Sequence, residues 1–111
     1  MTVASWPAEA QRKAVDAAGA ARLVESGQRI YVQGGCAVPS ALIDAIVSRR
    51  DELRDIEIVH LHTEAPAPYV APDMQGHFRH NALFIGNNVR EAVNAGRADF
   101  TPVFLSHIPR L

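Results

Sequence analysis

The sequence is poor in cysteine, has no long apolar run and carries no excess of charge of either sign. Its single cysteine, Cys36, excludes an internal disulfide and fits a reducing compartment. Its apolar stretches are a few residues long, far below the roughly 20 that a membrane-spanning helix needs. Residues 1–7 also lack the basic and apolar regions of a secretory signal. We therefore expect a soluble cytoplasmic protein with no membrane partner.

The charge balance excludes a further class of partner. The 11 Lys and Arg residues meet 12 Asp and Glu residues, which leaves a net charge of −1. Such a chain has no general electrostatic attraction to the phosphates of nucleic acid. What the sequence does contain is apolar residues, at 48% of 111, which is enough for one domain with a buried core.

Strand-forming and helix-forming segments alternate along the chain. Runs rich in β-branched and aromatic residues predict strands at residues 29–32, 56–61 and 81–85, and a weaker one at 99–104 that Pro102 interrupts. Apolar periodicity and capping residues predict helices at residues 16–25, 39–47 and from 87 or 88 to 93. Residues 51–55 form a polar connection or a short extra turn, and residues 105–111 begin another element.

This order predicts the fold class. Strands that alternate with helices pair in parallel through right-handed crossovers, so we expect an α/β fold: an open, mostly parallel, Rossmann-like sheet with flanking helices. Ligands of such sheets bind beyond the carboxyl ends of the strands. Three helices are few for the two faces of a parallel sheet. We therefore expect part of the cover to come from protein outside this sequence.

One connection is too long and too rich in proline for regular structure. Residues 63–77 contain Pro66, Pro68, Pro72 and Gly76. A loop of this length inside a compact domain is usually functional or forms a lid.

A glycine-rich turn follows the first predicted strand. Gly34, Gly35, Cys36 and Ala37 stand between that strand and a helix, where glycine lets the backbone turn tightly and lets a ligand approach. The unpaired N–H groups of the helix start suit a phosphate or a carboxylate. The pattern is neither GxGxxG nor a P-loop, so a tight turn without a ligand remains the alternative.

A similar arrangement follows the third predicted strand. Gly86 precedes Asn88, which can cap a helix, and Arg90, which can bind a carboxylate or a phosphate one turn later. The alternative is an ordinary helix cap with an exposed arginine.

The remaining reactive residues allow other chemistry. Cys36 near a helix start and His62 beyond the second strand can form a nucleophilic pair, although a lone cysteine more often serves as a small packed residue. His60 with His62, and His77 with His80, are spaced for a metal, but no partner completes a recognisable set. Glu64 follows His62, and a carboxylate on a proline-rich loop is more often exposed than catalytic.

Several segments in order resemble the acetyl-CoA hydrolase/4-hydroxybutyrate CoA-transferase family. The matching pieces start near residue 14 and include residues 26–32, 34–39, 59–69, 78–86, 88–90, 92–100 and 102–106. The resemblance implies an amino-terminal extension at 1–13 and an incomplete amino-terminal CoA-transferase domain at 14–111. It also implies that the rest of the family's chain, with a second α/β domain, lies outside this sequence.

The resemblance implies a chemistry as well. Family enzymes transfer coenzyme A between carboxylic acids or hydrolyse the thioester, in acetate metabolism for example, through a glutamate nucleophile of the second domain. No residue here matches that glutamate. The two domains face each other across the active site, so the substrate-binding residues expected here are Gly34, Gly35, Cys36, Ala37, His62, Gly86, Asn88 and Arg90.

The same resemblance sets the expected ligands and partners. These are an acyl-CoA thioester and a small carboxylate as substrates, no tightly bound cofactor or metal, the missing carboxy-terminal domain, and a second copy in a homo-oligomer. Two alternatives stay open from the residues alone: a non-catalytic phosphate- or carboxylate-binding module, and a small Cys–His hydrolase.

Overall fold

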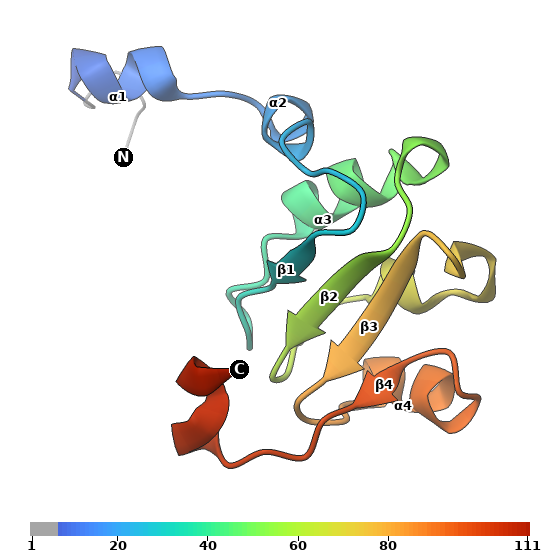
Figure 1. Cartoon of the computed structure of the whole chain (residues 1–111). Helices are drawn as coiled ribbons and strands as arrows, with labels where there is room; N and C mark the ends of the chain where they lie inside the picture. The colour runs from blue at the N-terminus through green and yellow to red at the C-terminus, as the bar shows by residue number, and fades with distance from the viewer. Residues whose placement is uncertain (1–6) are drawn as a thin grey trace.

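A computed structural model describes residues 7–111, and its centre is a four-stranded parallel sheet (Figure 1). The strands are adjacent in chain order: β1 (Arg29–Tyr31), β2 (Ile56–His60), β3 (Phe78–Ala82) and β4 (Asp99–Phe100). All three pairings are parallel, with Ile30 beside Ile58 and Ile58 beside His80. The predicted α/β fold with an open parallel sheet is confirmed.

Short helices surround this sheet. The α-helices are α1 (Ala8–Lys13), α2 (Ala17–Ala21), α3 (Ser40–Val47) and α4 (Asn87–Asn94). The 3₁₀ helices are η2 (Arg50–Glu52), η3 (Pro68–Val70), η4 (Pro72–Met74) and η5 (Leu105–Arg110). Helix α1 extends away from the body of the molecule, whereas α3 lies behind the sheet in the view of Figure 1.

The core lies on one face of the sheet. The inward side chains of β1, β2 and β3 pack against α3 and against the proline-rich loop, which returns to the sheet through η3 and η4. The core cluster comprises Val32, Ile43, Leu53, Ile56, Ile58, Tyr69, Met74 and Phe78. The long loop is therefore anchored in the core by Tyr69 and Met74.

The opposite face of the sheet is polar and open. A hydrogen-bonded line crosses it from Arg29 through Glu57 and Asn81 to Thr101, with contacts of 2.6, 3.1 and 2.8 Å. Beside it Arg79 binds Asp99 through two hydrogen bonds. A hollow of about 210 Å³ separates the apolar part of this face from Ile108 and Leu111 of the C-terminal segment. The polar groups of this face bind one another across the strands.

The third strand is displaced from its predicted position. It runs from Phe78 to Ala82 instead of residues 81–85. Phe78, His80 and Ala82 point into the core, while Arg79 is exposed and Asn81 is half-buried. The prediction chose the apolar run at 82–85 because His80 and Asn81 have low strand propensity. In the structure, tertiary contacts hold these two residues in the strand despite that propensity.

Other boundaries also differ from the prediction. Asp16 caps α2 as expected, since its side chain accepts a hydrogen bond from the Gly19 N–H at 2.6 Å, but the helix ends at Ala21. Strand β2 ends at His60, and β4 has two residues because Pro102 follows. The N-cap of α4 is Gly86, and no side chain caps the helix, so the predicted cap by Asn87 or Asn88 is wrong. Among residues 7–111, no helix is long and apolar enough to span a bilayer.

Candidate functional site

The turns after β1 and β2 are joined at the carboxyl edge of the sheet. Gly35 and Thr63 form a parallel β-bridge: the Gly35 N–H donates to the His62 carbonyl at 2.7 Å, and the Glu64 N–H donates to the Gly35 carbonyl at 3.0 Å. This turn places Gly35 in the left-handed region, at a φ of 61°, which glycine adopts without strain. The first predicted glycine turn therefore extends the sheet by one bridge toward the site.

Two glycines allow both neighbouring turns to approach His62. A Cβ atom placed on Gly34 would lie 2.9 Å from the His62 carbonyl oxygen. A Cβ atom placed on Gly86 would lie 2.9 Å from Nδ1 of the His62 ring. The Gly34 and Gly86 turns thus meet on His62 at one edge of the sheet, as parallel strands in this order require.

His62 is held by a carboxylate and by a phenyl ring. Its Nε2 lies 2.5 Å from Oε1 of Glu64, and its ring stands edge-on to Phe84 with 5.5 Å between centroids. Its Nδ1 is buried against Gly86 and has no hydrogen-bond partner. The pair with Glu64 is partly solvated, since the His62 and Glu64 side chains are 37% and 60% exposed.

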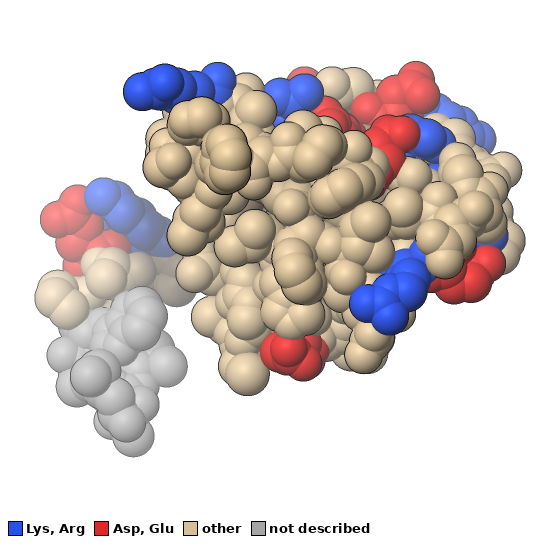
Figure 2. All heavy atoms as spheres, turned by 90° about the horizontal axis from the view of Figure 1, so that it is seen from below, with Lys and Arg blue, Asp and Glu red and all other residues tan. Residues whose placement is uncertain are grey.

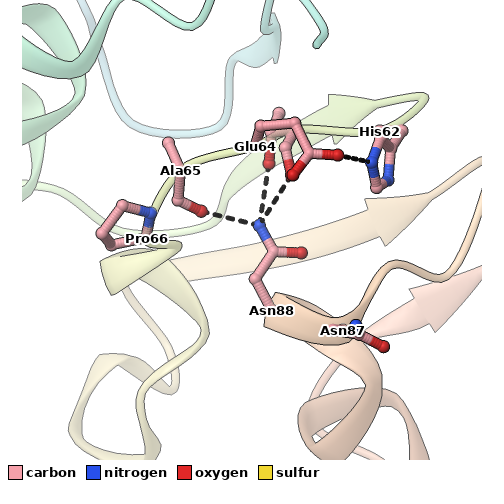
Figure 3. Close-up of a pocket in the computed structure, with 7 residues that line it drawn as sticks. His62, Glu64, Ala65, Pro66, Asn87 and Asn88 are labelled. Atoms are coloured by element: carbon pink, nitrogen blue, oxygen red, sulfur yellow. Dashed lines mark hydrogen bonds and ion pairs between the residues drawn. The ribbon is translucent and has the colours of Figure 1, made fainter. Parts of the chain in front are cut away.

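Asn88 fastens the loop after β2 to the start of α4. Its Nδ2 donates to the Thr63 hydroxyl at 2.9 Å, to the Ala65 carbonyl at 2.8 Å and to the Thr63 carbonyl at 3.3 Å. Figure 3 shows the amide pointing from the first turn of the helix into the loop. The Asn88 side chain therefore does not cap α4 but joins this helix to the loop after β2.

These residues enclose a pocket of about 330 Å³. Its lining comprises His62, Thr63, Glu64, Ala65, Pro66, Asn87 and Asn88, most of which are drawn and labelled in Figure 3. Glu64 is the one carboxylate in this lining, and the Asn88 amide points toward its loop from the start of α4, where Asn87 also lies. Figure 2 views the molecule from below and shows a broad uncharged surface with most charged side chains toward its margins.

The structure separates the predicted site residues into two groups. Gly34, Gly35, His62, Gly86 and Asn88 meet at the pocket or directly behind it.

Cys36, Ala37 and Arg90 lie apart from this pocket. The first two are exposed on the β1 turn, and Arg90 lines a neighbouring hollow with Asn87 and Glu91.

Sequence reasoning missed Thr63, Ala65, Pro66 and Asn87 as lining residues and gave Glu64 little weight. The signal that could have indicated them is the polar run at residues 62–64, directly after the strand predicted at 56–61.

Within the described residues, no side chains are arranged for the two alternative chemistries, a Cys–His nucleophile and a metal site. No hydrogen bond joins the exposed Cys36 thiol to His62, whose Nε2 faces Glu64. Within residues 7–111, no group of three or more His, Cys, Asp or Glu side chains is placed to bind a metal ion. His77 lies away from the other histidines and contacts the Leu53 carbonyl at 3.0 Å.

The open parallel sheet with glycine turns at its carboxyl edge defines a Rossmann-like α/β domain. Solved structures share this fold: RipA from Yersinia pestis matches with a TM-score of 0.72 at 18% identity, over 87% of this chain and 25% of that one. Variants of RipA match with a TM-score of 0.76. At this identity the likeness establishes the fold alone.

Sequence comparison establishes the family. The model described as "Acetyl-CoA hydrolase/transferase N-terminal domain" matches residues 5–111, so the chain belongs to this family at its N-terminal domain. The succinyl-CoA:acetate/propanoyl-CoA:succinate CoA transferase of Fasciola hepatica is 44% identical over 90 residues, which are 79% of this chain and 18% of that protein.

A second relative covers more of the chain. The 4-hydroxybutyrate coenzyme A transferase of Clostridium kluyveri is 39% identical over 106 residues, which are 96% of this chain and 25% of that protein. The chain thus spans about a fifth to a quarter of the length of these curated relatives. The resemblance inferred from the sequence is confirmed.

Proposed function

We propose that this chain forms one wall of an active-site cleft that transfers coenzyme A between an acyl-CoA thioester and a small carboxylate. The observation that carries the proposal is the meeting of the Gly34 and Gly86 turns on His62 beside a polar pocket at the carboxyl edge of the sheet. Relatives that align over most of this chain carry the names of CoA transferases. Transfer and hydrolysis of the thioester both fit this wall.

The chemistry assigned to this wall is binding and orientation. Helix α4, which starts beside the Gly86 turn, has no side-chain cap, and the N–H groups of Asn87 and Asn88 in its first turn are free for an acyl or carboxylate oxygen. At the start of α3 the Ser40 and Leu42 N–H groups already donate to the Val38 and Pro39 carbonyls. Oriented N–H donors stabilise the oxyanion that develops when a nucleophile attacks a thioester. The exposed Arg90 stands one turn into α4, where it can attract a carboxylate.

The nucleophile of the reaction belongs to the opposite wall. We propose that a glutamate in the remaining three quarters of the longer protein attacks the acyl-CoA, so that this chain alone is inactive. The open polar face of the sheet, with Tyr31 and Leu111 exposed beside it, offers a surface for that remaining part or for a second copy. Coenzyme A enters as a thioester substrate, without a tightly bound cofactor.

Ligand binding by the isolated chain tests this proposal. We expect millimolar acetyl-CoA to shift the backbone amide resonances of residues 34–37 and 86–90 and the ring signals of His62 in heteronuclear NMR spectra. The amides near Arg54 and His77 at the opposite end of the sheet serve as the internal control and should not move. The thioester should remain intact throughout the titration.

Two results would contradict the proposal. Shifts confined to the Arg54 end would place the ligand at the wrong edge of the sheet. Hydrolysis of acetyl-CoA by the chain alone that is lost in Cys36→Ala would support the Cys–His hydrolase instead.

A further inference from the structure

Two hollows adjoin at the start of α4. One is the pocket of about 330 Å³ described above, and the other is a hollow of about 590 Å³ lined by Asn87, Arg90, Glu91, Asn94 and Ala95. Asn87, the first residue of the helix, lines both of them. We call the two hollows together the α4 groove. A small molecule bound in one of them can therefore reach into the other.

Arg90 gives one end of the α4 groove an unpaired positive charge. Among residues 7–111, no carboxylate forms an ion pair with Arg90. The neighbouring Glu91 does not balance it, because both oxygens of the Glu91 carboxylate accept hydrogen bonds from Arg97. The free N–H groups at the uncapped start of α4 lie in the same part of the groove. This end is therefore suited to a carboxylate.

Glu64 gives the other end of the groove a negative charge (Figure 3). Its Oε1 contacts His62 Nε2 at 2.5 Å, and its Oε2 has no hydrogen-bond partner among residues 7–111. A doubly protonated His62 would bury its Nδ1 N–H beside Gly86 without an acceptor, so we assign the neutral ring with its proton on Nε2. The pair keeps one full negative charge, and the lining of this pocket contains no Lys or Arg.

We propose that the α4 groove binds a small carboxylic acid in one direction, and that Glu64 determines which acids it accepts. The carboxylate of the acid lies at Arg90 and the start of α4, and its tail extends toward Glu64. A second carboxylate at the end of that tail would come beside Glu64 and be repelled, whereas a methyl or ammonium group would not. The substrate class is therefore small monocarboxylic acids, and dicarboxylic acids are rejected.

The repulsion depends on solvent. The Glu64 side chain is 60% exposed in this chain, so dissolved ions screen its charge. The discrimination between acids should thus be largest at low ionic strength and should shrink as salt is added.

The inference deepens the proposed function and rests on it, because it names the acids that the same wall accepts. The two can fail separately. If acetyl-CoA shifts the amides of the glycine turns while all acids bind alike, only this inference fails. If the acids are discriminated as predicted while acetyl-CoA moves no amide of the turns, only the proposed function fails.

A titration with three four-carbon acids tests the inference. Butyrate, 4-aminobutyrate and succinate carry a neutral, a positive and a negative group at the far end, and each is added to the ¹⁵N-labelled 111-residue chain at pH 7.5 and low salt. The amide signals of Ala65, Asn87 and Asn88 report binding. We expect a Kd for butyrate at least about fivefold below that for succinate, and 4-aminobutyrate should bind no more weakly than butyrate. In Glu64→Gln the ratio of the succinate and butyrate Kd values should fall to about one.

Two further variants separate the charge of Glu64 from other effects. Asp51→Asn is the matched control, because it removes the same charge from an exposed position on η2 outside both hollows; it should leave the ratio unchanged. Arg90→Gln should weaken all three acids by a similar factor, because Arg90 contacts the carboxylate that they share. Added salt should move the wild-type ratio toward that of Glu64→Gln.

Four outcomes would overturn the inference. These are equal binding of butyrate and succinate by the wild type, a ratio that Glu64→Gln leaves unchanged, and tighter binding of succinate that Arg90→Gln abolishes, which would mean that the acid lies in the opposite direction. The fourth is the absence of shifts at the Asn87 and Asn88 amides with every acid.

Discussion

We expect the titration of His60 by itself to lower the free energy of unfolding by about 3 kcal/mol between pH 7.5 and pH 4. Burial, with smaller contributions from His80 and His62, lowers the pKa of His60 from 6.5 to about 3 in the folded protein. The unfolded chain therefore binds one more proton than the folded chain between these two pKa values. Stability is fully present above pH 6.5 and is lost as the pH falls toward 3.

His80 adds to this loss in the same direction. Its pKa is also lowered by burial, which outweighs the opposing effect of its hydrogen bond to Ile58. Urea unfolding at several pH values between 7.5 and 4 measures the slope. In His60→Gln, where the side chain does not titrate, the slope should flatten by up to about 1.4 kcal/mol per pH unit. The exposed His107→Gln is the control; a slope unchanged in both variants contradicts the account.

Gly34→Ala is expected to destabilise the protein by about 1–3 kcal/mol. The new Cβ would lie 2.9 Å from the His62 carbonyl oxygen, which already accepts the Gly35 N–H at 2.7 Å. A backbone atom has no rotamer to adopt, so the bridge between Gly35 and Thr63 must open. Urea unfolding measures the loss, and faster exchange of the Gly35 and Glu64 amides locates it.

Gly86→Ala is the matched comparison, because its Cβ would meet a ring instead of a backbone atom. The His62 ring is part-exposed and can turn away at the cost of its contact with Glu64. We expect a loss below about 1 kcal/mol, in the range of a surface ion pair. Equal losses for the two variants would mean that the turns do not pack on His62 as described.

The sequence predicted the fold class and the position of the candidate site at the carboxyl edge of the sheet. Both follow from the alternation of strands and helices. The strands at residues 29–32 and 56–61 were placed within one residue, since β-branched side chains serve both local propensity and burial there. The third strand was misplaced because His80 and Asn81 are held in it by contacts from other strands. Such contacts leave no local pattern in the sequence.

The candidate site was predicted in part for a similar reason. Gly34 and Gly86 could be predicted because glycine is required where the backbone turns tightly and lies close to another group, here His62. Asn88 was recognised but given the role of a cap, and its actual partners, Thr63 and Ala65, lie about 25 residues away. Tyr69 was not singled out in the sequence, and His60 was considered there only as a metal ligand. The two side chains meet because the proline-rich loop folds back to the core.

A chimeric enzyme tests the central claim most directly. The 106 residues of the Clostridium kluyveri 4-hydroxybutyrate coenzyme A transferase that align with this chain would be replaced by the corresponding residues of this chain, and CoA transfer to a carboxylate would be measured. We predict a folded enzyme that transfers CoA and loses most of this activity with Gly86→Val, whose branched side chain would displace His62 from the cleft. A folded chimera without transfer activity, or one that Gly86→Val leaves fully active, would contradict the assignment of this wall.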